Sequence, residues 1–468
     1  MWRTECEDTA DSTRLLWIAA GNDLAHVGGV GKAACYNESA RLKLCHEGFF
    51  AFMSTLLKDY SHYVNQGWAD TLDALGTVPI FVKAQGDRLY DTEDNVWFDF
   101  IGHYGATLFG HNFEPLTRAL KRALDAQLPA GAPLGITTLA PNLAKTLIER
   151  LQLRGNWNNW TLSTGAEAVE AALKIAVSST GRRKILVRRG AFHGLTAFTL
   201  QLNDRTFWRK GYEVLTESVL VDFFDDVDEG NQLLASEHYA ALLVEPVQAI
   251  AGGRILNADE ADRLRTGCTR YGSLFITDEV FSGMGRCGDY SAMQALGWRV
   301  EPDIILLSKT LTGGLIPSAQ LVVRQALFNA FTCRPGCSKL LSSTFSGNPL
   351  GHSVALEVLA HLEPVLSDPE GNLPQAHFTA QLSELAKAYP TSLVNVLSLT
   401  NLHFLRFTTA DLASEVWRYL HANQILTTIC SHQPDTLKLI CALGQTTESQ
   451  DRLYEVIEYV CEEASNAG

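Results

Sequence analysis

The chain has 468 residues, of which 46% are hydrophobic and 19% charged, a balance typical of a folded protein that excludes a disordered one. Its formal net charge of -14 argues against a nucleic-acid partner, because no net positive field would attract the phosphate backbone. Apolar runs such as 15–20 are far too short to cross a bilayer, and acidic residues follow Arg3 at once, unlike a secretory signal. We therefore expect neither a nucleic-acid nor a membrane partner.

The ten cysteines are scattered along the chain and form no disulfide framework. This usage is typical of a reducing compartment, so we expect a cytoplasmic protein. Cys333 and Cys337 are the closest pair, but no second pair or nearby group of histidines completes the four ligands of a zinc site. The sequence predicts no bound metal.

Residues 1–50 are interpreted as an N-terminal extension. The small-residue stretch 26–32 superficially resembles a phosphate loop, but His26 stands where the first glycine belongs and Ala33 follows the lysine in place of Ser or Thr. From Pro79 the pattern changes to short β-like runs separated by turn residues, at 80–83 and 95–100.

The middle of the chain alternates apolar runs with helical segments. The runs are continuous and mostly branched, as in strands buried on both faces, and lie at 185–187, 241–244, 274–276 and 304–307. Helices are expected between them, notably at 166–178 and 258–270. Strand and helix in alternation predict an α/β fold with a mainly parallel sheet covered on both sides. Mixed helices and short strands follow, such as 436–441.

Two opposite charges follow two of these strands. Asp278 comes directly after the run that ends at Thr277, and only Ser308 separates Lys309 from the run 304–307. Ligands of open α/β sheets bind at the carboxyl ends of the strands, so both charges point to one shared site. For either residue alone, a strand-end cap or a solvated loop charge remains the alternative.

A possible anion site precedes the predicted helix 166–178. Free backbone N–H groups at a helix N-terminus bind phosphate, Gly165 allows close approach, and the Thr164 hydroxyl can donate as well. The alternative is that Thr164 is simply a helix N-cap. Phe192 and His193 follow another strand end, where a core phenylalanine and a satisfied loop histidine are the alternative.

Together these groups match the needs of pyridoxal 5'-phosphate (PLP): a lysine for its aldehyde, an acid for its pyridine nitrogen, an anion cradle and flat apolar cover. At this point the sequence resembles the class III (omega) aminotransferases, fold type I PLP enzymes, over roughly residues 75–460. Seven stretches carry the resemblance in the family's order: 162–172, 192–196, 244–248, 276–280 with 285–286, 302–309, 313–319 and 343–349.

The resemblance implies roles for individual residues. Lys309 would be catalytic and hold PLP as a Schiff base, and Asp278 would pair with the pyridinium. Val280 and Phe192 would cover the two faces of the ring, and Thr344 would reach the phosphate from a neighbouring subunit, which implies a homodimer with shared active sites. The complete set of expected cofactor-binding residues is Thr164, Gly165, Ala166, Phe192, His193, Asp278, Val280, Lys309 and Thr344.

The family also implies a domain plan: a large PLP-binding domain at 106–349 and a smaller α+β domain built from both chain ends, 51–105 and 350–468. Departures from the family pattern fall where a substrate would bind. Phe281 replaces a glutamine, and Lys438 stands where many members have an arginine that grips a carboxylate, although lysine lacks the planar fork for a bidentate grip. We expect Lys438 to affect substrate choice and to have little effect on the cofactor. The substrate residues expected are Tyr104, Glu245, Phe281 and Lys438.

The function expected is an aminotransferase that moves an amino group from an amine or amino acid to a carbonyl acceptor. Motifs that hold PLP do not separate this reaction from an aminomutase, decarboxylase or epimerase on the same scaffold. A non-catalytic homologue is disfavoured by the intact Lys309 and Asp278, and a nicotinamide dehydrogenase by the absence of a G-x-G-x-x-G motif after a strand near the start of a βαβ unit.

Overall fold

The structure is a computed structural model. It describes residues 55–74, 78–132, 134–204, 206–212, 220–236, 238–367 and 373–467. The predicted N-terminal extension, 1–50, lies outside the described residues. The chain divides into two compact units, Met1–Val78 and Pro79–Gly468. In the first unit, α3 (Gln66–Asp73) begins at Asn65, whose side chain accepts a hydrogen bond from the Trp68 backbone N–H.

The second unit contains a seven-stranded sheet. Its strands, in spatial order, are β4 (Trp157–Leu162), β12 (Ala319–Arg324), β11 (Ile304–Leu307), β10 (Leu274–Asp278), β7 (Tyr239–Val244), β5 (Lys184–Arg188) and β6 (Leu220–Phe224). The four apolar runs of the sequence are the adjacent strands β11, β10, β7 and β5, which are mutually parallel. Within this sheet β12 is antiparallel to both of its neighbours, β11 and the edge strand β4, and the other pairs are parallel. The prediction of an α/β fold with a mainly parallel sheet is confirmed.

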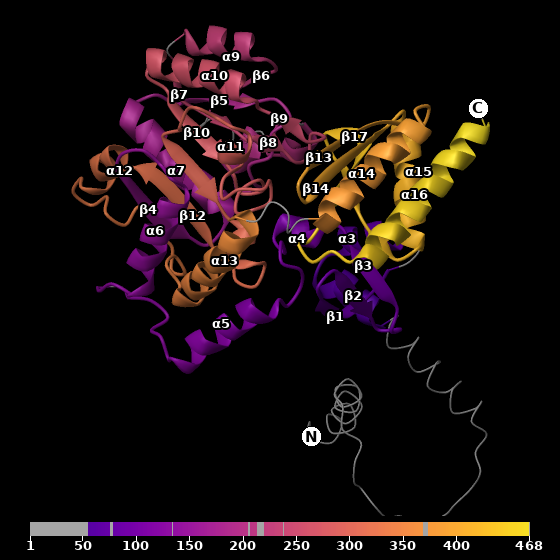
Figure 1. The fold of residues 1–468 in the computed structure, drawn as a ribbon. Helices are drawn as coiled ribbons and strands as arrows, with labels where there is room; N and C mark the ends of the chain where they lie inside the picture. Colours follow the sequence, from indigo (N-terminus) through magenta and orange to yellow (C-terminus); the bar gives the residue numbers. More distant parts are fainter. Residues whose placement is uncertain are drawn as a thin grey trace, which may run out of the picture. The chain divides into compact units, whose positions relative to one another are not determined.

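Side chains of one strand alternate between two covered faces of the sheet. Ile304 and Leu306 pack with α7 (Gly165–Thr180), whereas Ile305 and Leu307 pack in the cluster on the other side. Figure 1 shows α7 lying across the strands of this sheet, in contact with strands from β4 to β7. Because both faces are buried, the strands read as continuous apolar runs.

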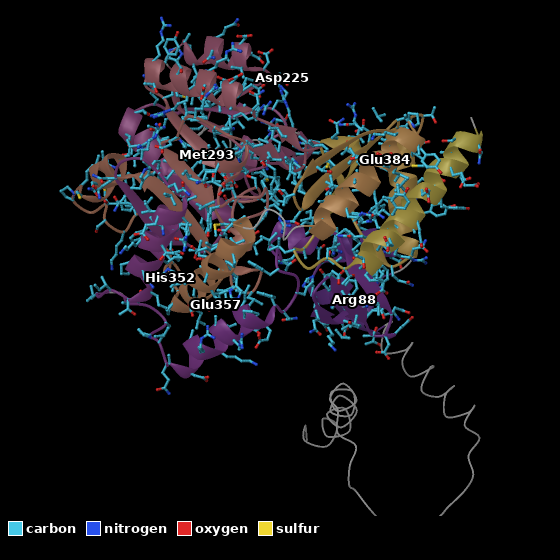
Figure 2. All side chains as sticks on the ribbon, viewed as in Figure 1. Arg88, Asp225, Met293, His352, Glu357 and Glu384 are labelled. Carbon is cyan, nitrogen blue, oxygen red and sulfur yellow. The ribbon has the colours of Figure 1, made fainter. Side chains whose placement is uncertain are left out.

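Helices of the opposite face fall into two groups. Next to β11 and β12 the cluster is completed by α5 (Glu114–Asp125), α6 (Leu139–Arg150) and α13 (Pro349–Ser367). Next to β5 and β7 it is completed by α9 (Val227–Leu234) and α10 (Ala258–Tyr271). Met293, labelled in Figure 2, is buried in the first of these clusters, whereas the labelled Asp225 is exposed.

The two predicted helices extend slightly beyond their expected limits. Helix α7 begins after Thr164, whose hydroxyl caps the Glu167 N–H, and ends at Gly181 with φ +69°. Its small residues, such as Ala168 and Ala172, let it approach the sheet closely. Helix α10 begins with a capping box formed by Asn257 and Glu260.

A second core is formed by both ends of the Pro79–Gly468 unit. The sheet β13 (Leu393–Leu399), β14 (Leu402–Phe407), β17 (Gln433–Ile440) and β16 (Thr428–Cys430) packs with α14 (Leu373–Ala388), α15 (Ala410–Ala422) and α16 (Thr447–Ala467). A further sheet has the order β1 (Phe81–Gln85), β2 (Arg88–Asp91), β3 (Val96–Asp99) and β15 (Ile425–Leu426). Since β3 pairs with β15 and Phe98 shares a core with Leu437, the two segments fold together.

Helix α13 bears on the expected domain limit at residue 350. Its residues Val354 and Val358 are fully buried in the same cluster as Ile305 of the seven-stranded sheet. The helix also packs against α5 and α6. We therefore propose that the C-terminal part of the small domain begins after α13.

Candidate active site

The two charges expected to share a site end neighbouring parallel strands. Asp278 is the last residue of β10, and its Cα pairs with Leu306 of β11. Lys309 begins the short helix η3 (Lys309–Thr312) with φ +46°, a left-handed conformation that costs about 1–2 kcal/mol for a residue with a Cβ. Its neighbours fix this turn, since Thr310 Oγ1 donates to Gly105 O at 3.0 Å.

Asp278 is held by two hydrogen bonds. His193 Nδ1 lies 2.7 Å from Asp278 Oδ2, and the Val280 N–H donates to Oδ1 at 3.0 Å. Burial by itself would lower the pKa of His193, but the hydrogen bond and the negative charge of Asp278 raise it overall. His193 Nε2 is buried and has no hydrogen-bond partner among the residues that the structure describes. The pair therefore presents a fixed, buried carboxylate at the end of β10.

A second acid lies beside this pair. Glu245 follows β7, is 5% exposed, and accepts a hydrogen bond from the Phe192 N–H at 3.0 Å. Burial raises the pKa of Glu245 to about 7, and the negative charge of Asp278 contributes in the same direction. Glu245 thus fixes the backbone at Phe192, the residue expected to cover the cofactor ring.

The N-terminus of α7 and Val280 are in close contact. A Cβ added at Gly165 would lie 2.8 Å from Val280 Cγ1, so only glycine fits at this approach. At the next residue of the helix, a Cβ added at Gly194 would lie 2.8 Å from the Cβ of Ala166. The Thr164 hydroxyl accepts a hydrogen bond from a backbone N–H of α7, which leaves its own proton available to donate.

Phe281 brings two lysines together. Lys309 Nζ lies 4.9 Å and Lys438 Nζ 5.5 Å from the centroid of the Phe281 ring. The ring is 7% exposed and is packed so closely against Gly105 that a Cβ there would lie 2.8 Å from Cε2. Burial first, and then the positive charge of Lys438, lower the pKa of Lys309 to about 8.

The sequence indicates no role for Arg286 beyond its place in the stretch 285–286. It is fully buried, and its guanidinium donates to Gly105 O at 2.9 Å and to Cys441 O at 2.7 Å. It therefore ties the segment behind Phe281 to the end of β17. Both partners are backbone carbonyls far away in sequence, so no sequence signal identifies them.

Two expected residues lie at the margin of this cluster. Tyr104 is 63% exposed with φ +53°, next to the Gly105 that contacts Phe281. Thr344 is exposed in a turn after Ser343, whose Oγ lies 3.3 Å from Ser163 Oγ. No hydrogen bond, ion pair or ring contact joins Tyr104 or Thr344 to Lys309 or Asp278 within the described chain.

The family pattern described as aminotransferase class-III matches residues 74–460. The chain belongs to this family. Acetylornithine aminotransferase from Aquifex aeolicus is 30% identical over 312 residues, 66% of this chain and 79% of that protein. Aminotransferase PigE from Serratia sp. is 30% identical over 338 residues, which span 71% of this chain but only 39% of PigE.

Solved structures show the same fold. The ornithine aminotransferase from Toxoplasma gondii matches with a TM-score of 0.76 at 22% identity and covers 90% of this chain and 95% of that chain. The predicted class III membership and fold type I architecture are confirmed. As a class III aminotransferase, the protein uses PLP and transfers amino groups, as expected.

The described residues fit this cofactor. A buried carboxylate stands at the end of β10, and a lysine of lowered pKa follows the neighbouring strand. The N–H groups at the start of α7 lie beside a position where a Cβ has no room. No group of His, Cys, Asp or Glu that could hold a metal occurs in the described residues. No helix in the described part of the chain is both long and apolar enough to span a membrane.

Proposed function

We propose that this aminotransferase works through Lys309 and Asp278, with PLP held between Phe192 and Val280. The observation that supports this most strongly is the Asp278–His193 pair at 2.7 Å, one strand away from a lysine whose pKa is lowered to about 8. An amine of that kind has a substantial neutral fraction near neutral pH and is therefore a usable nucleophile and base.

When bound, PLP supplies an aldehyde that an amine can attack and a ring that withdraws electrons from the substrate carbon. Asp278 would supply the negative charge that keeps the pyridine nitrogen protonated, and His193 fixes the orientation of that carboxylate. The N–H groups of Gly165 and Ala166 would bind the phosphate at the positive end of α7. Lys309 Nζ would take a proton from the substrate carbon and deliver it to the former aldehyde carbon, as transfer of the amino group requires.

The proposed donor is a primary amine at the end of a short aliphatic chain. Relatives named ornithine, acetylornithine and putrescine aminotransferase support this class, since each named compound contains such an amine. Lys438 is 6% exposed and lies on the same ring as Lys309, which places a cation where a carboxylate of the donor or acceptor would be held. Tyr104 and Glu245 complete the proposed substrate residues.

The enzyme is further proposed to act as a cytoplasmic homodimer. Thr344 is exposed beside Phe345, which is 71% exposed, and Leu134 and Ile136 are almost fully exposed, so a subunit interface would bury them. The seven cysteines in the described residues form no disulfide, as in a reducing compartment. Sedimentation or light scattering of the purified protein tests the dimer, and a monomer at working concentration contradicts it.

The residue assignment is tested by the half-reaction. With an amine donor and no acceptor, the PLP-loaded protein should convert its cofactor to the pyridoxamine form, seen in the visible absorbance. Lys309→Ala should bind PLP without covalent attachment and lose this conversion, because no amine remains to take the proton. Lys184→Ala, on the amino end of β5, is the matched control and should behave as wild type. Conversion by Lys309→Ala at the wild-type rate would remove Lys309 from the mechanism.

A further inference from the structure

Lys438 is a buried amine without an acid. It lies on β17, 6% exposed, with Phe404 and Thr428 as its neighbours on the adjacent strands. Among the described residues, no carboxylate pairs with its ammonium and no group accepts a hydrogen bond from it. A buried charge without such partners is costly, and its protonated form is therefore highly sensitive to other charges nearby.

The second cation on the aromatic ring that Lys438 contacts is Lys309. Both amines lie within 5.5 Å of the centroid of Phe281, so the two nitrogens cannot be farther apart than the sum of their two distances to that centroid. The face of an aromatic ring attracts a cation, which makes Phe281 a shared support for both. Two positive charges this close in a partly dry site shift each other's protonation midpoint by on the order of one pH unit.

Four charged residues from different parts of the chain act on Lys309. Asp278 at the end of β10 and Glu245 after β7 favour its protonated form, whereas Lys438 and Arg286 oppose it. Arg286 is committed to two backbone carbonyls.

Lys438 has no such bond to a backbone carbonyl among the described residues. Burial lowers the pKa of Lys438, whereas Cys430 and Glu245 act in the opposite direction. Its charge therefore acts on Lys309 over the pH range in which Lys438 stays protonated.

We propose that Lys438 is a positioning residue that keeps Lys309 unprotonated by holding a second cation on the Phe281 ring. The proposal rests on the assignment of Lys309 as the lysine that binds PLP. An amine attacks an aldehyde only through its lone pair, which the protonated amine lacks. A neutral Lys309 therefore takes up PLP at a lower pH than an ordinary lysine would. The direction agrees with the lowered pKa of Lys309.

The test is the pH dependence of PLP uptake by cofactor-free enzyme, followed by absorbance and fixed by borohydride. In the wild type, the uptake rate should rise with pH around a midpoint near 8. Lys438→Met, which keeps length but removes charge, should move the midpoint up by on the order of one pH unit. Lys438→Arg should keep the wild-type midpoint or lower it, because its charge does not titrate. Lys184→Met is the matched control and should change nothing.

Either of two results overturns the proposal. A Lys438→Met midpoint equal to wild type overturns the proposal, as does a wild-type midpoint near the ordinary lysine value of about 10.4. If Lys438→Met does not fold, Lys438→Gln is the second neutral variant, and a Lys438→Gln midpoint equal to wild type overturns the proposal. Mapping the residue that borohydride links to PLP distinguishes failure of the proposed function from failure of the role of Lys438. Attachment at a residue other than Lys309 refutes the proposed function. Attachment at Lys309, with the same midpoint in Lys438→Met as in the wild type, refutes only the role of Lys438.

Discussion

The buried carboxylates at the end of the seven-stranded sheet have fixed partners, whereas the buried amine on β17 has none among the described residues. Asp278 is held by His193 and the Val280 N–H, and Glu245 by the Phe192 N–H. Lys438 meets them only across the ring of Phe281. The first region is therefore preorganised for one cofactor. In the second region, the charge of Lys438 can still be paired by a group of a bound ligand. Cofactor chemistry and substrate choice thus depend on two regions that meet and interact at the ring of Phe281.

The largest expected effect comes from breaking the preorganised region. Asp278→Asn keeps the shape of the side chain but removes the charge that keeps the pyridine nitrogen protonated. Turnover should therefore fall by orders of magnitude, since each factor of ten corresponds to about 1.4 kcal/mol of lost transition-state stabilisation. Steady-state kinetics at saturating PLP measure it. The exposed Asp225→Asn is the matched control and should leave turnover unchanged. Near wild-type turnover in Asp278→Asn would show that this carboxylate is not part of the mechanism.

A smaller effect is expected in the unpartnered region. A charge-assisted hydrogen bond of about 1.5–3 kcal/mol between Lys438 and a substrate carboxylate predicts roughly a ten- to hundredfold loss of kcat/KM in Lys438→Ala, mainly through KM. The measurement is made at a pH where every variant is fully loaded with PLP. Lys438→Arg should keep or improve the use of carboxylate substrates, and simple amines should be little affected. Equal kinetics for acidic and neutral substrates in both variants would place the carboxylate anchor elsewhere.

The smallest effect is expected from a substitution in the cofactor-binding region. In Gly165→Ala the new Cβ meets Val280, and overpacking of about 1–3 kcal/mol predicts roughly tenfold weaker PLP binding with little change in turnover once loaded. Equilibrium titration with PLP gives the affinity. Gly444→Ala, where nothing lies within 4 Å of the added Cβ, is the control. Unchanged affinity in Gly165→Ala would show that Val280 can move away at no cost.

The sequence predicted what depends on local pattern. The buried strands β5, β7, β10 and β11 read as continuous apolar runs because both of their faces are covered, and the charges that follow them were correctly placed at one end of the sheet. The edge strand β4, with its sequence WNNWTL, has no such run and was not predicted. Lys438 lies far in sequence from every cofactor motif, so its position beside Lys309 was not predicted. Only the packing of β17 against Phe281 brings the two lysines together.

The most direct test of the account is to identify the amine that binds PLP. Borohydride reduction of the PLP-loaded wild-type enzyme, followed by proteolysis and mass spectrometry, locates the modified residue. The site contains two amines on one ring, so the result is a choice between them. The account predicts the label on Lys309, at the end of the sheet where Asp278 stands one strand away. A label on Lys438, or on any other lysine, would contradict it.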